Sequence, residues 1–187
     1  LASALLKTNP GALVVHDPRL TWNTIELVEE AGGRTVQSKS GHAFIKETMR
    51  EVNAAYGGEM SAHHYFREFG YCDSGMIPWL LLTQIMGSKN KSLAELVNER
   101  IEKFPVSGEI NVEVSNTATV IAEVKSHFGT AQHTLDEMDG IGMDFGTWRF
   151  NLRSSNTEPL LRLNVESRGD HILMEQKRDE LLEIINR

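Results

Sequence analysis

The feature that most constrains the fold is a pair of alternating runs in the last third of the chain. Residues 148–152 carry Trp, Phe and Leu at every second position, and residues 161–165 continue this alternation with Leu, Leu and Val. Alternation with a period of two predicts strands that each bury one face. Because a polar segment, residues 153–159, separates the runs, the sequence predicts an antiparallel hairpin with a long loop.

The predicted loop carries groups that bind phosphate. Arg153 supplies a guanidinium, and the residues that follow it are Ser154, Ser155, Asn156 and Thr157. A cationic fork, hydroxyls, a side-chain amide and free backbone N–H groups together suit a dianionic phosphate. Ser, Asn and Thr are also common in ordinary turns, so a surface turn is the competing interpretation.

Composition narrows the class of protein. The 187 residues are 40% hydrophobic and 24% charged, which is typical of globular proteins. A net charge of −7 argues against a nucleic-acid partner. The longest apolar run, residues 76–82, is far shorter than the roughly 20 residues of a membrane span, so no membrane partner is expected. A single cysteine, Cys72, excludes an internal disulfide and favours a cytoplasmic location.

The first part of the chain predicts alternating strands and helices. Residues 12–15 form an apolar strand, a helix with the capping-box pattern Asn23 to Glu26 follows, and residues 34–37 form the next strand. A loop and a further helix begin near His42, where open α/β sheets bind ligands. His42 is therefore a candidate for anion binding or proton transfer, and a solvent-facing histidine is the alternative.

Residues 57–66 are the second concentration of polar groups. Glu59, Ser61, His63 and His64 offer donors and acceptors suited to sugar hydroxyls. Ser61 and His63 could form a nucleophile and its base, but no third group that would orient the base follows at a recognisable spacing, which argues against this interpretation. Adjacent residues on a strand point to opposite faces, so His63 and His64 are not expected to bind one metal ion together. A strand that enters a polar turn is the structural alternative.

The middle of the chain predicts two helices. The apolar run 76–86 predicts a buried helix, and residues 87–91 predict a flexible break. The pattern Ser92 to Glu95 is a capping box that opens a connector helix over residues 92–103.

The remaining residues predict a second domain with the element order βαβββα. A strand near residue 110 and a helix over 117–128 precede a hairpin turn at Asp139, which we interpret as a turn residue and not as a metal ligand. We expect an α/β domain over residues 1–103, with a mixed sheet flanked by helices. We expect a smaller α+β domain over residues 104–187, with an antiparallel sheet and two helices.

Four motifs, in order, resemble those of the α-D-phosphohexomutases, particularly the bacterial phosphomannomutase/phosphoglucomutase branch. They are Asp17-Pro18-Arg19, Ser40-Gly41-His42, Gly58-Glu59-Met60-Ser61-Ala62-His63 and Arg153-Ser154-Ser155-Asn156-Thr157-Glu158-Pro159. The family has four domains, and the chain resembles the third and fourth. The chain also begins without Met, so we expect a fragment whose partners are the missing N-terminal domains of the same protein. Ala62 departs from the glycine usual in the family, and Arg19 replaces a lysine found in some relatives.

The resemblance implies roles for particular residues. It implies that Glu59 and Ser61 hold sugar hydroxyls and that Arg19, His42 and His63 line the active-site cleft. Arg19 and His42 would also have supporting roles in catalysis. A guanidinium stays charged, which argues against proton transfer by Arg19. The resemblance further implies that the phosphate is bound by Arg153, Ser155, Asn156 and Thr157.

The resemblance also implies an activity that this fragment lacks. The family transfers phosphate from a phosphoserine in its first domain, with Mg²⁺ held by an Asp-rich loop of its second domain and a hexose 1,6-bisphosphate as activator. Neither motif occurs here. We therefore expect the inactive C-terminal part of a phosphomannomutase that acts on a phosphorylated hexose, mannose 6-phosphate or mannose 1-phosphate, for surface polysaccharide. The alternatives are phosphoglucomutase, phosphoglucosamine mutase or, in another class, a non-catalytic phosphosugar-binding module.

Overall fold

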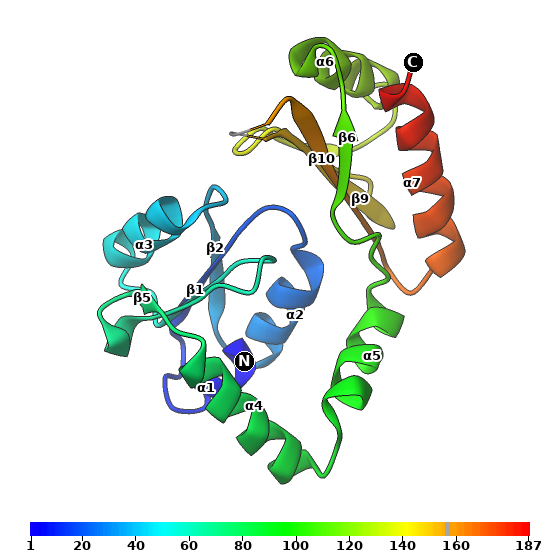
Figure 1. Cartoon of the computed structure of the whole chain (residues 1–187). Coiled ribbons are helices and arrows are strands. Elements are labelled where there is room, and N and C mark those ends of the chain that lie inside the picture. The colour runs from blue at the N-terminus through cyan, green and yellow to red at the C-terminus, as the bar shows by residue number, and fades with distance from the viewer. Residues whose placement is uncertain (156–157) are drawn as a thin grey trace. The chain divides into compact units, whose positions relative to one another are not determined.

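The computed structural model describes residues 1–155 and 158–187 (Figure 1). These residues divide into two compact units, Leu1–Glu99 and Arg100–Arg187. Each unit has its own sheet and its own hydrophobic core.

The first unit is built on a five-stranded sheet with the order β2-β1-β3-β4-β5. Its strands are β1 (Leu13–His16), β2 (Arg34–Gln37), β3 (Tyr56–Gly58), β4 (His64–Phe66) and β5 (Cys72–Asp73). β1 pairs in parallel with β2 and β3, whereas β4 and β5 extend the sheet in antiparallel pairs. The expected mixed sheet is therefore confirmed.

Helices cover both faces of this sheet because neighbouring strand residues point to opposite sides. Val14 packs in one core with α1, α2 and α4, and Val15 packs in another with α3. Figure 1 shows α2 and α3 on opposite sides of β1. The helices are α1 (Ala2–Leu6), α2 (Trp22–Glu30), α3 (His42–Glu51) and α4 (Met76–Lys89).

The two predicted capping boxes have different outcomes. α2 begins at Trp22, so Asn23 lies inside the helix instead of capping it, and that prediction is wrong. The second box is confirmed at the start of α5 (Leu93–Lys103). There the Ser92 N–H donates to Glu95 Oε2 at 2.8 Å, and the Glu95 N–H donates to Ser92 Oγ at 3.2 Å.

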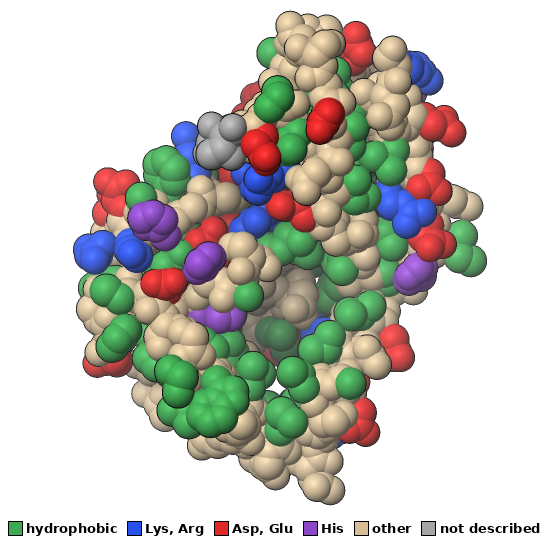
Figure 2. Space-filling model, viewed as in Figure 1, with side chains coloured by type: hydrophobic (Ala, Val, Ile, Leu, Met, Phe, Trp, Pro, Cys, Tyr) green, Lys and Arg blue, Asp and Glu red, His purple; other side chains and the backbone are tan. Residues whose placement is uncertain are grey.

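α4 differs from its prediction in length and burial. The helix continues through Lys89 and ends at Asn90 in the left-handed conformation, so the predicted break over residues 87–91 is mostly helical. The helix is also not buried, since Met76, Trp79 and Leu80 are exposed. Figure 2 shows hydrophobic side chains at the surface in the lower part of the view, where Figure 1 places α4. An apolar run therefore predicted the helix correctly and its burial wrongly.

The second unit is an antiparallel sheet with the order β6-β10-β9-β8-β7 and two helices on one face. The helices α6 and α7 contribute Val124 and Leu181 to the core beneath Phe150 and Leu163. The elements are β6 (Ile110–Glu113), α6 (Thr117–Phe128), β7 (Thr134–Asp136), β8 (Ile141–Asp144), β9 (Trp148–Ser154), β10 (Leu160–Ser167) and α7 (His171–Ile185).

The predicted hairpin is confirmed by the register of β9 and β10, in which Leu152 lies opposite Leu163. The predicted order βαβββα omits one strand, because four strands follow α6. β7 is only three residues long, too short for alternation to be recognised. In the described part of the chain, no helix has the length and apolar character that a membrane crossing requires.

Candidate functional site

The site of the first unit lies where two parallel strands end. β1 and β3 run in the same direction, with His16 opposite Gly58, so the loops that follow them leave the sheet at the same edge. One loop begins with Asp17 and the other with Glu59. Parallel strands of α/β sheets bind ligands at this edge.

Asp17 connects the two loops. Its carboxylate accepts hydrogen bonds from Arg19 Nη2 at 2.5 Å and from Arg19 Nε at 3.0 Å. It also accepts from the backbone N–H of Met60 at 2.9 Å. Asp17 and Arg19 are both buried, and breaking such a pair leaves an uncompensated charge. Asp17 therefore fixes the guanidinium and the start of the 59–63 turn together.

Glu59 is held by groups from three segments. The Tyr65 hydroxyl donates to Oε1 at 2.5 Å, and the backbone N–H of Gly41 donates to Oε2 at 3.1 Å. Arg19 Nη2 lies 3.5 Å from Oε2. These contacts fix the carboxylate, and an ionised carboxylate has further lone pairs that can accept hydrogen bonds from a ligand.

Ser61 and Ala62 form the tip of the turn between β3 and β4. Arg19 Nη2 lies 3.4 Å from Ser61 Oγ, which places the exposed serine beside the same guanidinium. The turn is closed by the Glu59 N–H, which donates to His63 O at 3.0 Å. Ala62 has φ +64°, the left-handed conformation that favours glycine. The alanine therefore occupies a glycine-like backbone conformation.

The adjacent histidines have different partners. His63 is exposed, and its Nδ1 lies 3.1 Å from Asp73 Oδ2; this hydrogen bond lowers the pKa of the Asp73 carboxyl. The His64 Nδ1 lies 2.5 Å from the Tyr56 hydroxyl, and burial lowers the pKa of His64. Among residues 1–155 and 158–187 there is no group of three His, Cys, Asp or Glu side chains that could hold a metal ion.

His42 is the first residue of α3 and is exposed. The residue before it, Gly41, has φ +119°, and its N–H binds Glu59. The Ser40-Gly41-His42 motif therefore contributes the backbone N–H of Gly41 to the site, and the role of the His42 side chain stays a prediction.

Sequence reasoning missed Tyr65 and the linking role of Asp17. Tyr65 is fully buried on β4, where an aromatic residue is typical of hydrophobic packing. Nothing in its sequence context indicates a hydrogen bond to a carboxylate. Asp17 lies inside a recognised motif, but its bond to Met60 joins residues 43 positions apart and depends on the fold.

The predicted phosphate loop lies in the second unit. Arg153 is near the end of β9 and is 7% exposed, and its Nη2 lies 3.6 Å from Glu109 Oε2. The Ser155 N–H donates to Leu160 O at 2.9 Å, so the expectation that the loop's N–H groups are free is wrong for this residue. Asn156 and Thr157 lie outside the described residues.

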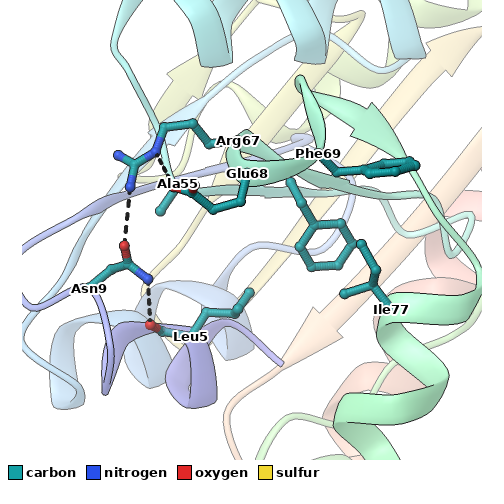
Figure 3. Close-up of a pocket in the computed structure, with 8 residues that line it drawn as sticks. Leu5, Asn9, Ala55, Arg67, Glu68, Phe69 and Ile77 are labelled. Carbon is teal, nitrogen blue, oxygen red and sulfur yellow. Dashed lines mark hydrogen bonds and ion pairs between the residues drawn. The ribbon is translucent and has the colours of Figure 1, made fainter.

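A separate cavity of about 210 Å³ lies in the first unit (Figure 3). At its rim Arg67 Nη2 donates to Asn9 Oδ1 at 3.1 Å. The close-up shows Phe69 and Ile77 among its lining residues, and none of the predicted site residues lines it. The polar groups that suit a sugar therefore gather at Glu59 and not at this cavity.

Comparison with known proteins gives matches along nearly the whole chain. Residues 1–104 match the family described as Phosphoglucomutase/phosphomannomutase, alpha/beta/alpha domain III, and residues 109–184 match Phosphoglucomutase/phosphomannomutase, C-terminal domain. A protein named Phosphohexose mutases from Xanthomonas campestris pv. campestris (strain B100) is 61% identical over 185 residues, which are 99% of this chain and 41% of that protein. Phosphomannomutase from Salmonella montevideo is 59% identical over 186 residues, covering 100% of this chain and 41% of its own length.

A solved structure also resembles the chain. The crystal structure of a phosphoglucomutase/phosphomannomutase family protein from Burkholderia thailandensis superposes with a TM-score of 0.80 at 26% identity, covering 98% of this chain and 39% of that chain. The chain thus spans less than half the length of these relatives.

Proposed function

Because the chain belongs to the phosphoglucomutase/phosphomannomutase family, we propose that it is the sugar-recognition and phosphate-anchoring part of a phosphomannomutase. In this proposal the whole protein interconverts mannose 6-phosphate and mannose 1-phosphate through a hexose 1,6-bisphosphate. The observation that carries it is the Glu59 carboxylate, fixed beside Ser61 and Arg19 at the sheet edge. Relatives 58–59% identical over the whole chain are named phosphomannomutase.

The proposed role of Glu59 is to accept hydrogen bonds from sugar hydroxyls. Tyr65, Gly41 and Arg19 already hold the carboxylate, so little side-chain freedom is lost when a sugar binds. Ser61 adds a hydroxyl at the exposed tip of the turn. Arg19 remains charged and is paired with Asp17 and Glu59, so its role is to orient these groups and not to transfer a proton. His42 and His63, both exposed, are proposed to line the same site.

Arg153 and Ser155 are the described members of the proposed phosphate anchor, and Asn156 and Thr157 complete it from sequence. A guanidinium presents two parallel N–H donors to a phosphate group, which gives orientation as well as affinity. The anchor holds the phosphate that does not react, while the Glu59 site recognises the hexose.

The chemical step belongs, in this proposal, to domains that this chain does not span. The described residues do not fit a Mg²⁺ site, since they contain no group of three candidate ligands. The phosphoserine and the Mg²⁺ loop are therefore assigned to the rest of the protein, which is the partner of this chain. A cytoplasmic location fits, because the one cysteine, Cys72, is free.

The test is a mutase assay with mannose 1-phosphate, the bisphosphate activator and Mg²⁺. We expect turnover by the whole protein and none by the 187-residue chain. Arg153→Ala in the whole protein should lower kcat/KM about ten- to a hundredfold, because a charged hydrogen bond contributes about 1.5–3 kcal/mol. Arg178→Ala, which removes a guanidinium from α7, is the matched control.

Turnover by the 187-residue chain alone would overturn the assignment of chemistry to other domains. An unchanged kcat/KM in Arg153→Ala would remove Arg153 from the anchor. Relative kcat/KM on mannose, glucose and glucosamine phosphates decides the sugar. Binding of these sugars by the whole protein without turnover would instead support a phosphosugar-binding module.

A further inference from the structure

The outer face of α4 exposes three large apolar side chains. Met76, Trp79 and Leu80 are 64%, 57% and 56% exposed. They are spaced by three and four residues, so they are neighbours on the surface of the helix. Another face of the same helix packs against the core of the first unit through Ile77 and Leu81. The helix is therefore apolar on its exposed face as well as on its packed face.

The sequence of α4 indicates that a protein surface covers this face. Residues 76–87 contain no charged side chain, and Lys89 at the end of the helix is the first. A helix that is apolar all round is typical of a position in which it is packed all round, and a contiguous exposed apolar patch is typical of an interaction site. Helices that bind membrane surfaces instead carry Lys and Arg for the anionic lipids.

The cavity of Figure 3 extends the exposed face. It has a volume of about 210 Å³, and its lining includes Ile77 and Phe69, which is itself 53% exposed. Ile77 is next to Met76 on α4 and one turn from Leu80, so the cavity lies beside the exposed face. We call the cavity and the exposed residues Phe69, Met76, Trp79 and Leu80 the α4 surface.

The relatives indicate what covers the α4 surface. The chain matches the models of domain III and of the C-terminal domain and covers 41% of the length of its relatives, so more than half of their length precedes the matched part. In these relatives the preceding residues join α1, which packs against the same core as Ile77. Figure 1 shows the N-terminus beside α1 and α4. Burial, followed by the charge of Lys89, lowers the pKa of the Leu1 amino group, which agrees with this position.

We propose that the α4 surface is the docking site for the domain that precedes this unit in the whole protein, and that an apolar side chain of that domain fills the cavity beside Ile77. Trp and Met are enriched in the cores of protein interfaces, and Trp is frequent among the residues that contribute most to binding. The inference goes beyond the proposed function, because it concerns the assembly of the protein and does not depend on the sugar.

The first test compares the whole protein with the 187-residue chain by hydroxyl-radical footprinting and mass spectrometry. Met and Trp side chains oxidise readily when solvent reaches them. We expect Met76 and Trp79 to oxidise several-fold more slowly in the whole protein. Ile172 on α7, which is 68% exposed and lies outside the α4 surface, is the internal reference and should react at the same rate in both proteins.

The second test places a charge on the α4 surface. Leu80→Lys keeps a good helix former in α4, so it should leave the urea midpoint of the 187-residue chain unchanged. In the whole protein it should lower the midpoint, because a lysine would be buried against an apolar partner. Ile172→Lys, the matched replacement of an exposed apolar residue on α7, should leave both midpoints unchanged.

Three outcomes would overturn the inference. Equal oxidation of Met76 and Trp79 in the two proteins would show that the preceding domain does not cover α4. A dimer of the whole protein in sedimentation experiments that Leu80→Lys dissociates would assign the α4 surface to a second copy. Protection that appears only after phosphatidylcholine vesicles are added would assign it to a lipid surface. The mutase assay of Arg153→Ala is independent of all three, so the proposed function stands or fails separately.

Discussion

The hydroxyl of Tyr65 donates a 2.5 Å hydrogen bond to Oε1 of Glu59, and this contact ties a buried strand residue to the proposed sugar-binding carboxylate. Burial and the bond to Glu59 raise the pKa of Tyr65, so the hydroxyl remains a donor at any physiological pH. Tyr65 is fully buried and cannot move away without opening the core. The carboxylate is therefore positioned by the interior of the first unit.

Tyr65→Phe should remove this positioning without changing the packing. Phenylalanine fills nearly the same volume, and Glu59 loses a donor to a charged group, a loss of about 1.5–3 kcal/mol. We expect kcat/KM of the whole protein to fall about tenfold or more, mainly through KM for the phosphosugar. Tyr71→Phe is the control, because its hydroxyl donates to Asn53 at the surface. Equal kinetics for Tyr65→Phe and the parent would show that Tyr65 does not position Glu59.

Ala62→Gly should stabilise the first unit. An L-residue in the left-handed conformation costs about 1–2 kcal/mol, and glycine at this position avoids that cost. Glycine also gives the unfolded chain more conformational freedom, which offsets part of the gain. We expect a net gain of about 0.5–1 kcal/mol in the free energy of unfolding, measured with urea. Ala122→Gly within α6 is the control of opposite sign, with an expected loss of about 1 kcal/mol. A loss of stability in Ala62→Gly would contradict the expectation.

Two glycines of the second unit separate backbone strain from steric clash. Gly140 and Gly146 have φ +75° and +83°, but a Cβ on Gly140 would lie 2.3 Å from Leu152 O and 2.6 Å from Arg153 Cα, whereas one on Gly146 meets nothing within 4 Å. Gly146→Ala should cost about 1 kcal/mol of stability. Gly140→Ala should cost about 3 kcal/mol, and it should weaken phosphate binding because Arg153 moves. Equal losses of unfolding free energy in the two variants, measured with urea, would show that β9 shifts enough to accommodate the added methyl group.

The first unit should lose stability in mild acid through His64. Burial, followed by the positive charges of the N-terminal ammonium group and of His63, lowers the pKa of His64 below its usual value of about 6.5. The unfolded chain therefore takes up the proton first, so this contribution is fully present above about pH 6.5 and is lost as the pH falls through the folded-state pKa.

Hydrogen exchange of the β3 amides at about pH 7.5 and about pH 5, corrected for intrinsic rates, measures this loss. His64→Gln should reduce the difference between the two pH values. The exposed His171→Gln is the control and should keep the parent's difference. The same difference in His64→Gln and the parent would assign the acid sensitivity to another group.

Local patterns predicted most of the elements. The alternation around residues 148–165 was sufficient for the β9–β10 hairpin, because a half-buried strand places its apolar residues at every second position. The capping box at Ser92 predicted the start of α5, because its hydrogen bonds join residues three positions apart. The apolar run of α4 predicted a helix but not its exposure, since burial depends on which surfaces pack against it.

The candidate site was predictable as a set of motifs and not as an arrangement. The motifs around Arg19, His42 and Glu59 were visible in the sequence, and the resemblance supplied their roles. Tyr65 was hidden because its hydroxyl acts on a residue that only the β3–β4 pairing brings close.

The chain's own periodicities, caps and turn residues thus determined where helices and strands form, because these signals act over a few neighbouring residues. Only the tertiary structure decided which polar and charged groups meet. Asp17 reaches Met60, Tyr65 reaches Glu59, and Glu109 reaches both Arg153 and Arg162. The energy of such contacts depends on the distance between the groups and on their burial, and neither can be read from their separation along the sequence.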